Sequence, residues 1–221
     1  SSDYYEEDKK LYTSSHSNVV KVKYSCSDNA YIYIAMPYYK NGSLQSFVNS
    51  NRLTIREIIR YSIQFLSGLH HIHSKGLIHF DIKPGNILIS DSNEALLSDF
   101  GLAKAMDDFG YASPEQFYKK HLPPESFSSS DKTIHFDLYL AGLTIYRLLN
   151  GESHFNRQLT QFKTNDEYIE AVKAGEFPNR NSYLAHVPLK LQRIVNKSLS
   201  INIEERQQSV LEFINDLSTV D

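Results

Sequence analysis

The sequence predicts an α+β fold in which helices predominate and strands are few and short. Three observations predict it. Runs rich in Val, Tyr and Ile with strand-like character stand before residue 40, a long helical pattern begins at Thr54, and a stretch that is apolar nearly all round covers 137–149. Short apolar runs separated by charged and Gly residues lie between the two helical regions, which is typical of loops that carry functional groups.

The composition restricts the class of protein. The 221 residues have a formal net charge of -3, which gives no indication of nucleic acid or an anionic membrane as a partner. A single cysteine, Cys26, excludes an internal disulfide framework and any site built from several thiolates. No apolar run approaches the roughly 20 residues of a membrane span, and residues 1–7 are too acidic for a secretory signal. We therefore expect an intracellular protein, cytoplasmic or otherwise.

The first part of the chain predicts one helix, one hairpin and one short helix. Residues 3–15 have an apolar seam at helical spacing, and the run ends in a polar stretch. Val19–Tyr24 and Ala30–Met36 are the two expected strands, and the polar residues between them form the turn. A Gly turn at 40–43 then leads into a short helix that ends near Val48.

The rest of the chain predicts several helices and three short strands. Thr54 and Glu57 match a capping box, and the helix that they begin should end at Gly76. Thr164 and Glu167 match a second one. The remaining expected elements are short strands at 77–78, 87–89 and 95–97, a buried helix at 137–149, and helices at 188–199 and 203–217.

Four residues in the loop-rich stretch suggest a reaction. Asp81 is followed by Lys83 two positions on and Asn86 five positions on, and Asp99 stands beside a Gly turn. Phosphoryl transfer from a metal nucleotide needs a carboxylate to orient the hydroxyl, a cation to steady the phosphoryl group, and oxygen ligands for Mg²⁺. The pattern therefore predicts Asp81 and Lys83 as catalytic residues and Asn86 and Asp99 as magnesium ligands.

These residues resemble those of the eukaryotic-type protein kinase family. Its H-R-D-x-K-x-x-N pattern is similar to His79–Asn86, with Phe80 where Arg is usual, and its D-F-G motif is similar to Asp99-Phe100-Gly101. The resemblance implies a protein-kinase-like fold with a mostly helical lower lobe at 41–221 and a partial upper lobe at 1–40. It also implies transfer of the γ-phosphoryl of MgATP to serine or threonine hydroxyls of a protein substrate.

Further motifs extend the resemblance over residues 7–217. Ser113-Pro114-Glu115 is similar to the family's A-P-E motif, and Arg206 matches the arginine that pairs with its glutamate, which implies a pair of Arg206 with Glu115. Asp137 matches the aspartate that begins the buried helix and anchors the apolar spine of active kinases. The spine residues implied here are Leu11, Val22, His79 and Phe100.

The resemblance also assigns an ATP site. Glu7 is implied to pair with the ATP-binding lysine, and Met36 takes the gatekeeper position. The carbonyl of Pro37 and the backbone of Tyr39 are the implied adenine partners. Ser43 stands at a frequent ribose contact, and Leu88 forms the floor under the adenine.

Three departures from the family matter. No glycine-rich loop or V-A-I-K lysine precedes Glu7, and the segment from Asp99 to Glu115 is short. We expect that the chain is part of a longer kinase from which the glycine loop, the lysine strand and part of the activation segment are omitted; the alternatives are a minimal kinase, or a pseudokinase that acts as a nucleotide-binding or protein-interaction module. Phe80 replaces the arginine that binds a phosphorylated activation segment in relatives, so switching by that route is not expected.

A small-molecule kinase is less favoured, because the motifs around Glu115 and Arg206 resemble the substrate platform of protein kinases.

Overall fold

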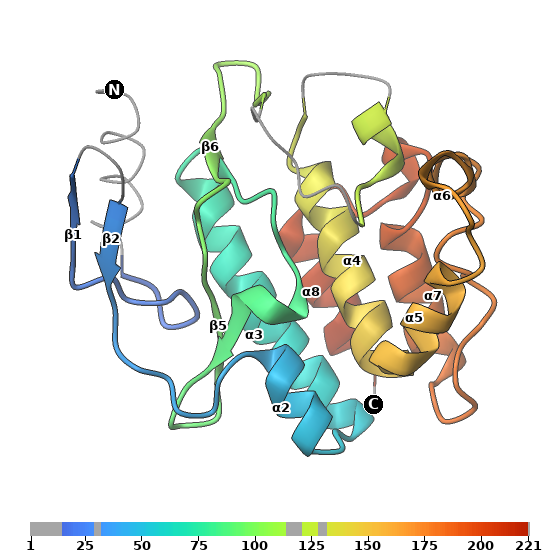
Figure 1. Cartoon of the computed structure of the whole chain (residues 1–221), viewed down its shortest axis with the longest axis horizontal. Helices are drawn as coiled ribbons and strands as arrows, with labels where there is room; N and C mark the ends of the chain where they lie inside the picture. The colour runs from blue at the N-terminus through green and yellow to red at the C-terminus, as the bar shows by residue number, and fades with distance from the viewer. Residues whose placement is uncertain (1–14, 29–31, 114–120, 128–131, 221) are drawn as a thin grey trace.

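A small β-hairpin and a larger helical body make up the structure, a computed structural model that describes residues 15–28, 32–113, 121–127 and 132–220 (Figure 1). The helix expected at 3–15 lies almost wholly outside the described residues. The hairpin pairs β1 (Tyr24–Ser27) with β2 (Ile32–Ala35) in antiparallel register, with Tyr24 opposite Ala35. It stands at one side of the helical body, beyond β5.

The strand expected at Val19–Tyr24 was wrong in its position. Residues 18–20 instead form a parallel bridge to β5, in which the Val20 N–H donates to the Leu97 carbonyl over 2.9 Å and the Leu97 N–H donates to the Asn18 carbonyl over 2.9 Å. Val19 and Val20 are buried there. The alternating pattern therefore marks a short edge on another hairpin, and β1 begins only at Tyr24.

The long helix α3 (Ile55–Ser74) confirms the prediction from its capping box. The Thr54 side chain accepts from the Glu57 N–H, and the Glu57 carboxylate accepts from the Thr54 N–H over 2.8 Å. Gly76, with a φ of 75°, allows the chain to turn away after the helix. The preceding α2 (Leu44–Ser50) is capped by Ser43 and buries Leu44.

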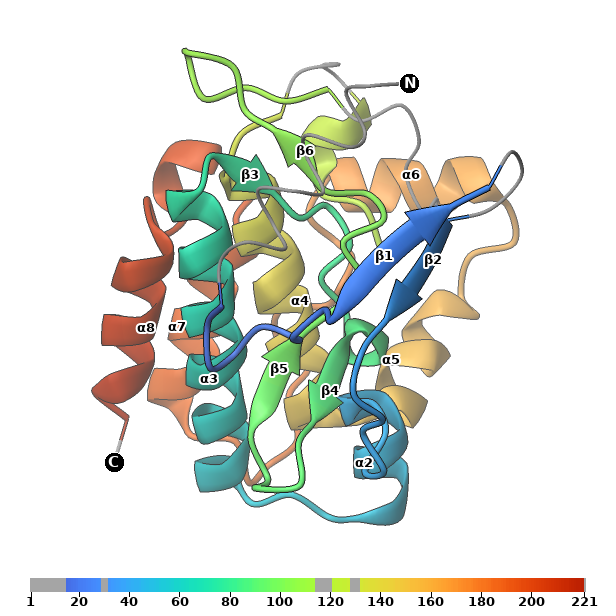
Figure 2. The same cartoon turned by 90° about the vertical axis from the view of Figure 1, so that its left-hand side faces the viewer.

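Short strands carry the loops beside α3. The two-stranded pairs are β3 (Leu77–Ile78) with β6 (Lys104–Ala105) and β4 (Ile87–Ile89) with β5 (Ala95–Leu97). Figure 2 shows the β4–β5 hairpin against α3. The one-turn helix η1 (Pro84–Asn86) leads directly into β4.

The helix α4 (His135–Asn150) is the centre of the core. Almost all of its side chains are buried, as the apolar sequence predicts, and it packs against α3, α5 (Glu152–Leu159) and α7 (Leu189–Ser198). The remaining helices are α6 (Asn165–Lys173), α8 (Val210–Ser218), and the one-turn η2 (Pro124–Phe127) and η3 (Ile203–Glu205). No helix in the described ranges combines the length and apolar character needed to cross a bilayer.

Two expectations for the helices needed correction. α5 was not predicted, and the single helix expected at 203–217 is divided into η3 and α8. Arg206 has an extended ψ of 170° at the break, and Ser209 caps the second helix. The division occurs because the Arg206 side chain turns inward and bonds to the Ser200 carbonyl, which a continuous surface helix would not permit.

We expect Gly68→Ala to destabilise the protein. A Cβ at Gly68 would clash with the carbonyl oxygen of Asn18, which accepts the Leu97 N–H. Overpacking of this kind costs about 1–3 kcal/mol, which exceeds the gain of up to about 1 kcal/mol in helix propensity. Denaturant unfolding monitored by circular dichroism measures the change. The neighbouring Ser67→Ala is the control, and an unchanged or raised free energy of unfolding for Gly68→Ala would show that residue 18 does not lie against α3.

Candidate active site

Asp81, Lys83 and Asn86 converge in the loop between β3 and β4. The Lys83 Nζ donates to Asp81 Oδ2 over 2.7 Å, and the Asn86 Nδ2 donates to the same oxygen over 2.7 Å and to the Asp81 carbonyl over 2.9 Å. The one-turn helix η1 sets this spacing, since Pro84 stands at its first turn and brings Asn86 back toward Asp81. The loop therefore presents one carboxylate that is oriented by a cation and an amide.

The oxygen of the Asn86 amide is available for a cation. Asn86 is buried, and its Nδ2 is fixed by two bonds to Asp81. Its Oδ1 has no hydrogen-bond partner in the described part of the chain. An amide oxygen and carboxylates are the hard ligands that Mg²⁺ prefers, so the donor set fits that ion.

Asp99 lies at the same end of the β4–β5 hairpin as Asn86. The Ser98 N–H and its hydroxyl both donate to the Asn86 carbonyl over 2.9 Å, which continues the ladder by one residue beyond the strands. Asp99 follows with a positive φ of 61° and is exposed. The left-handed turn redirects the chain at this point, and such strained residues cluster at functional sites.

His79 is a packed residue between the loop and Phe100. Its ring centroid is 5.0 Å from that of Phe100, so these two implied spine residues are in contact. Its Nδ1 accepts from the Asp81 N–H over 3.2 Å and its Nε2 donates to the Ser98 carbonyl over 3.1 Å. Burial lowers the pKa of His79 below its usual value, partly offset by Asp137 and other nearby carboxylates. The ring is therefore a neutral positioning group that connects both acidic loops.

The buried carboxylate of Asp137 holds the start of the loop. Its two oxygens accept from the N–H groups of His79 and Phe80, each over 2.8 Å, and its Oδ2 also bonds to His73 Nε2 over 2.8 Å. Phe80 has a positive φ of 67° and packs edge-on against Phe136. The Asp137 carboxylate at the start of α4 therefore fixes a strained backbone immediately before Asp81.

The end of the linker that is assigned to a nucleotide lies beside β4. Ser43 forms an antiparallel bridge with Leu88, and the Ile89 N–H donates to the Gly42 carbonyl over 2.9 Å. Leu88 is half-buried and Met36 is exposed. The structure brings Ser43 and Leu88 together.

Tyr39 is held by its own turn. Its carbonyl accepts from the Gly42 N–H over 3.0 Å. Burial raises the pKa of the Tyr39 hydroxyl, and the nearby backbone of Lys21 partly offsets the rise. Pro37 is half-buried on the same linker. Glu7, Leu11 and Glu115 lie outside the described residues.

A family model described as Protein kinase domain matches residues 1–217. The chain belongs to the protein kinase family. It is 28% identical over 208 residues to the probable serine/threonine-protein kinase PknB of Lactococcus lactis, which covers 93% of this chain and 32% of the relative. It is 27% identical to the serine/threonine-protein kinase PknD of Protochlamydia amoebophila, over 91% of this chain and 24% of the relative.

A third relative is from a plant. The chain is 32% identical over 152 residues to 3-phosphoinositide-dependent protein kinase 1 of Arabidopsis thaliana, over 63% of this chain and 31% of that protein. The chain thus spans about a third or less of the length of these three relatives. The protein-kinase-like, helix-rich fold that the sequence predicted is confirmed.

The structure corrects the expected partner of Arg206. The guanidinium forms a two-bond ion pair with Glu125, with Nη1 and Nη2 each 2.8 Å from a carboxylate oxygen, and Nη1 and Nε also donate to the carbonyls of His135 and Ser200. We had expected Glu115 in this role. Since the family pairs this arginine with the glutamate that ends the activation segment, the segment runs from Asp99 to Glu125 and is not short.

Two residues around the corrected motif were missed. Glu125 follows Pro124, as Glu115 follows Pro114, so the sequence contains two Pro-Glu pairs, and the prediction that the first of them pairs with Arg206 was wrong. Lys132 is buried, and its Nζ donates to the Glu125 carbonyl over 3.0 Å while its backbone exchanges two hydrogen bonds with Ala112. Lys132 thereby joins Ala112, in the middle of this segment, to Glu125 at its end, and no local sequence signal predicted it.

We expect Asp137→Asn to lower the free energy of unfolding by about 3 kcal/mol. An amide has one acceptor oxygen where the carboxylate has two, so a buried N–H of His79 or Phe80 would face an NH₂ group. Urea unfolding measures the loss. The exposed Asp91→Asn, which breaks only the surface pair with Lys40, should change stability by less than about 1 kcal/mol. Equal stability of both variants would contradict the role of Asp137.

The neutral His79 predicts a loss of stability in acid. In the unfolded chain this histidine gains a proton near its ordinary pKa of about 6.5, whereas the folded pKa is lower, so stability is complete above that pH and falls as the pH drops below it. The slope for one proton is at most about 1.4 kcal/mol per pH unit. Urea unfolding at several pH values between 8 and 5 should show a smaller slope for His79→Asn than for the wild type. His186→Asn, at an exposed site, should keep the slope.

Proposed function

We propose that the protein transfers the γ-phosphoryl group of MgATP to serine or threonine hydroxyls of proteins. The observation that carries the proposal is the convergence of Lys83 and Asn86 on one oxygen of Asp81. The family membership supports phosphoryl transfer in general, and Lys83 two residues after Asp81 resembles the serine/threonine branch. The three relatives named above all have printed names of protein kinases, two of them serine/threonine-specific.

The acceptor side of the site is assigned to Asp81 and Lys83. Asp81 is half-buried, and its carboxylate would accept the hydrogen bond of a hydroxyl and so orient its oxygen for attack. Lys83 keeps one ammonium beside that carboxylate, where negative charge on a transferring group would be stabilised. His79 fixes the backbone of Asp81 from behind, since its Nδ1 accepts the Asp81 N–H.

The metal-nucleotide side is assigned to Asn86 and Asp99. The amide oxygen of Asn86 and the carboxylate of Asp99 would bind Mg²⁺, and their common position at the end of the β4–β5 hairpin supports this assignment. The bound ion would neutralise charge on the phosphates. Met36, Pro37, Tyr39, Ser43 and Leu88 are proposed to contact the nucleoside, and Glu7 to pair with a lysine of the upper lobe. We propose the division into an upper-lobe part at 1–40 and a lower lobe at 41–221 on the same grounds.

We expect Asp81→Asn to lower kcat by about 10²–10⁴-fold, because the amide cannot accept the hydroxyl proton and orients it poorly. The loss is measured as the rate at which the full-length protein, supplied with radiolabelled MgATP, transfers phosphate to peptides that contain a single Ser, Thr or Tyr. The fold should remain, since the asparagine oxygen still accepts one of the two bonds from Lys83 and Asn86. Asp166→Asn, on the exposed first turn of α6, is the matched control and should keep full activity.

A different result would identify a pseudokinase. If the wild-type protein labels no peptide and not itself, and Asp81→Asn changes nothing, the enzyme proposal is wrong. If MgATP still raises the Tm of that inactive protein, the protein would be a nucleotide-binding interaction module. Transfer to Tyr peptides alone would contradict the serine/threonine assignment.

A further inference from the structure

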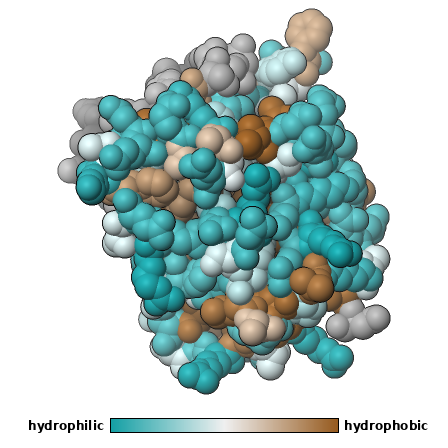
Figure 3. Space-filling view, turned by 90° about the vertical axis from the view of Figure 1, so that its right-hand side faces the viewer, coloured by the Kyte–Doolittle hydropathy of each residue, from teal (hydrophilic) through white to brown (hydrophobic). Residues whose placement is uncertain are grey.

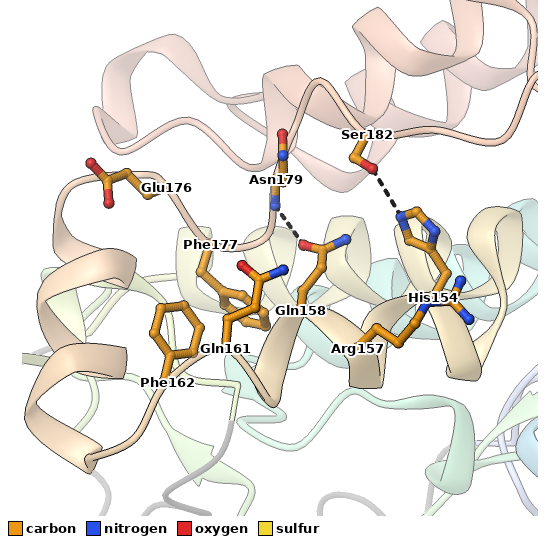
Figure 4. A pocket seen from close by; sticks show the side chains of 9 residues that line it. All are labelled: His154, Arg157, Gln158, Gln161, Phe162, Glu176, Phe177, Asn179 and Ser182. Atoms are coloured by element: carbon orange, nitrogen blue, oxygen red, sulfur yellow. Dashed lines mark hydrogen bonds between the residues drawn. The ribbon is translucent and has the colours of Figure 1, made fainter.

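A cleft of about 300 Å³ lies between α5 and the segment 176–182 (Figure 4). Figure 3 shows the face that carries α5, α6 and α7, which is mostly hydrophilic with separate apolar patches. The residues that line the cleft, here called the α5 cleft, are His154, Arg157, Gln158, Gln161, Phe162, Glu176, Phe177, Asn179 and Ser182.

The frame of the α5 cleft is fixed by hydrogen bonds between its two walls. Gln158 accepts from the Asn179 N–H over 2.8 Å and donates to the Tyr146 hydroxyl over 2.8 Å. His154 Nε2 bonds to the Ser182 hydroxyl over 3.1 Å. Gln158 and Phe177 are almost fully buried. The cleft is therefore already formed, and a ligand would not have to order its walls.

Three polar side chains at the α5 cleft have no partner among the residues that the structure describes. Arg157, Gln161 and Glu176 are exposed, and none of their side chains makes a hydrogen bond or an ion pair with the described residues. They contrast with Gln158 and His154 on the same helix, which join the walls. A fixed frame with unpaired donors and acceptors around it is the arrangement of a recognition site.

The unpaired groups are arranged in order along the α5 cleft. Figure 4 shows Glu176 at the end where Phe162 and Phe177 lie, Gln161 near the middle, and Arg157 beneath His154 at the opposite end. A ligand that complements this order has a cation near Glu176, an apolar group over the two rings, and an anion near Arg157. Amides such as Gln161 suit the N–H and carbonyl groups of a peptide backbone.

We propose that the α5 cleft docks an extended peptide segment of a protein acceptor, with a basic residue, an apolar residue and then an acidic residue. This identity of the docked protein rests on the proposed kinase function. Such a segment, outside the phosphorylated residue, raises the local concentration of the acceptor at Asp81.

The α5 cleft is joined to the activation segment by packed rings. Phe177 contacts Phe155 at 5.3 Å between centroids, and Phe155 contacts His121 at 5.1 Å. The His121 N–H also donates over 2.9 Å to the hydroxyl of Tyr168, a further ring neighbour of Phe177. His121 precedes Leu122, which lines a small depression together with Asp81 and Lys83. The docking position is thus rigidly connected to the candidate site.

A charge-swap binding experiment tests the proposal. The probes are fluorescein-labelled peptides Lys-Phe-(Ala)n-Glu, with n from one to four, and the same series with a final Lys, measured by fluorescence polarisation with the full-length protein. We expect the best Glu peptide to bind, Arg157→Glu to raise its Kd about five- to tenfold, and the matching Lys peptide to recover the lost affinity in that variant. Arg157 has no partner in the described structure, so the variant should fold.

The controls separate this proposal from its alternatives. Arg56→Glu, with the same charge change on the exposed first turn of α3, should leave the Kd unchanged. Asp81→Asn should bind the Glu peptide with an unchanged Kd. Peptide docking and the kinase assignment can therefore be tested independently. Absence of peptide binding, an equal Kd for Glu and Lys peptides, or displacement by succinate as effective as by unlabelled peptide would overturn the proposal, the last by showing a simple anion site.

Discussion

The arrangement of the candidate site depends on one buried carboxylate. Asp137 is fully buried at the start of α4, where its oxygens accept three hydrogen bonds, from the backbone N–H groups of His79 and Phe80 and from the His73 ring. A buried ion is favourable only when its hydrogen-bonding capacity is met, and here the loop itself meets it. The deeply buried helix α4 and the polar loop that carries Asp81 are therefore parts of one unit. The strained φ of Phe80 persists because that unit defines it.

The elements that the sequence predicts well are those whose signals are local. The capping box at Thr54, the apolar surround of 137–149, and the spacing of Asp81, Lys83 and Asn86 each involve residues within one helix or loop, and each has its expected structure or proximity. Val19–Tyr24 has a local alternation too, but its partner is Leu97, far along the chain. An alternating apolar pattern indicates an extended segment with one buried face, but it does not indicate which strand pairs with that segment.

The errors at the site have the same cause. Glu115 and Glu125 both follow a proline, and only the position of Arg206 in space distinguishes them. The break between η3 and α8 was missed for a related reason, since an arginine within a periodic apolar pattern indicates a surface residue of a helix, whereas Arg206 turns inward to the Ser200 carbonyl and Glu125. Lys132 shows no pattern of its own, because a lysine is rarely buried without partners, and the partners that the structure describes include backbone groups of Ala112 and Glu125, which no local pattern indicates.

The ion pair between Glu125 and Arg206 has a consequence for biosynthesis. A ribosome delivers Glu125 long before Arg206, so this carboxylate cannot form its buried ion pair until the chain has been made as far as residue 206. Until α7 has formed and η3 has turned the Arg206 guanidinium inward, the Glu125 carboxylate has no cation with which to form its ion pair. The structure around Glu125 is thus completed only after Arg206 has been made, and a nascent fragment that ends before this residue contains Asp81 and Asp99 without the ion pair.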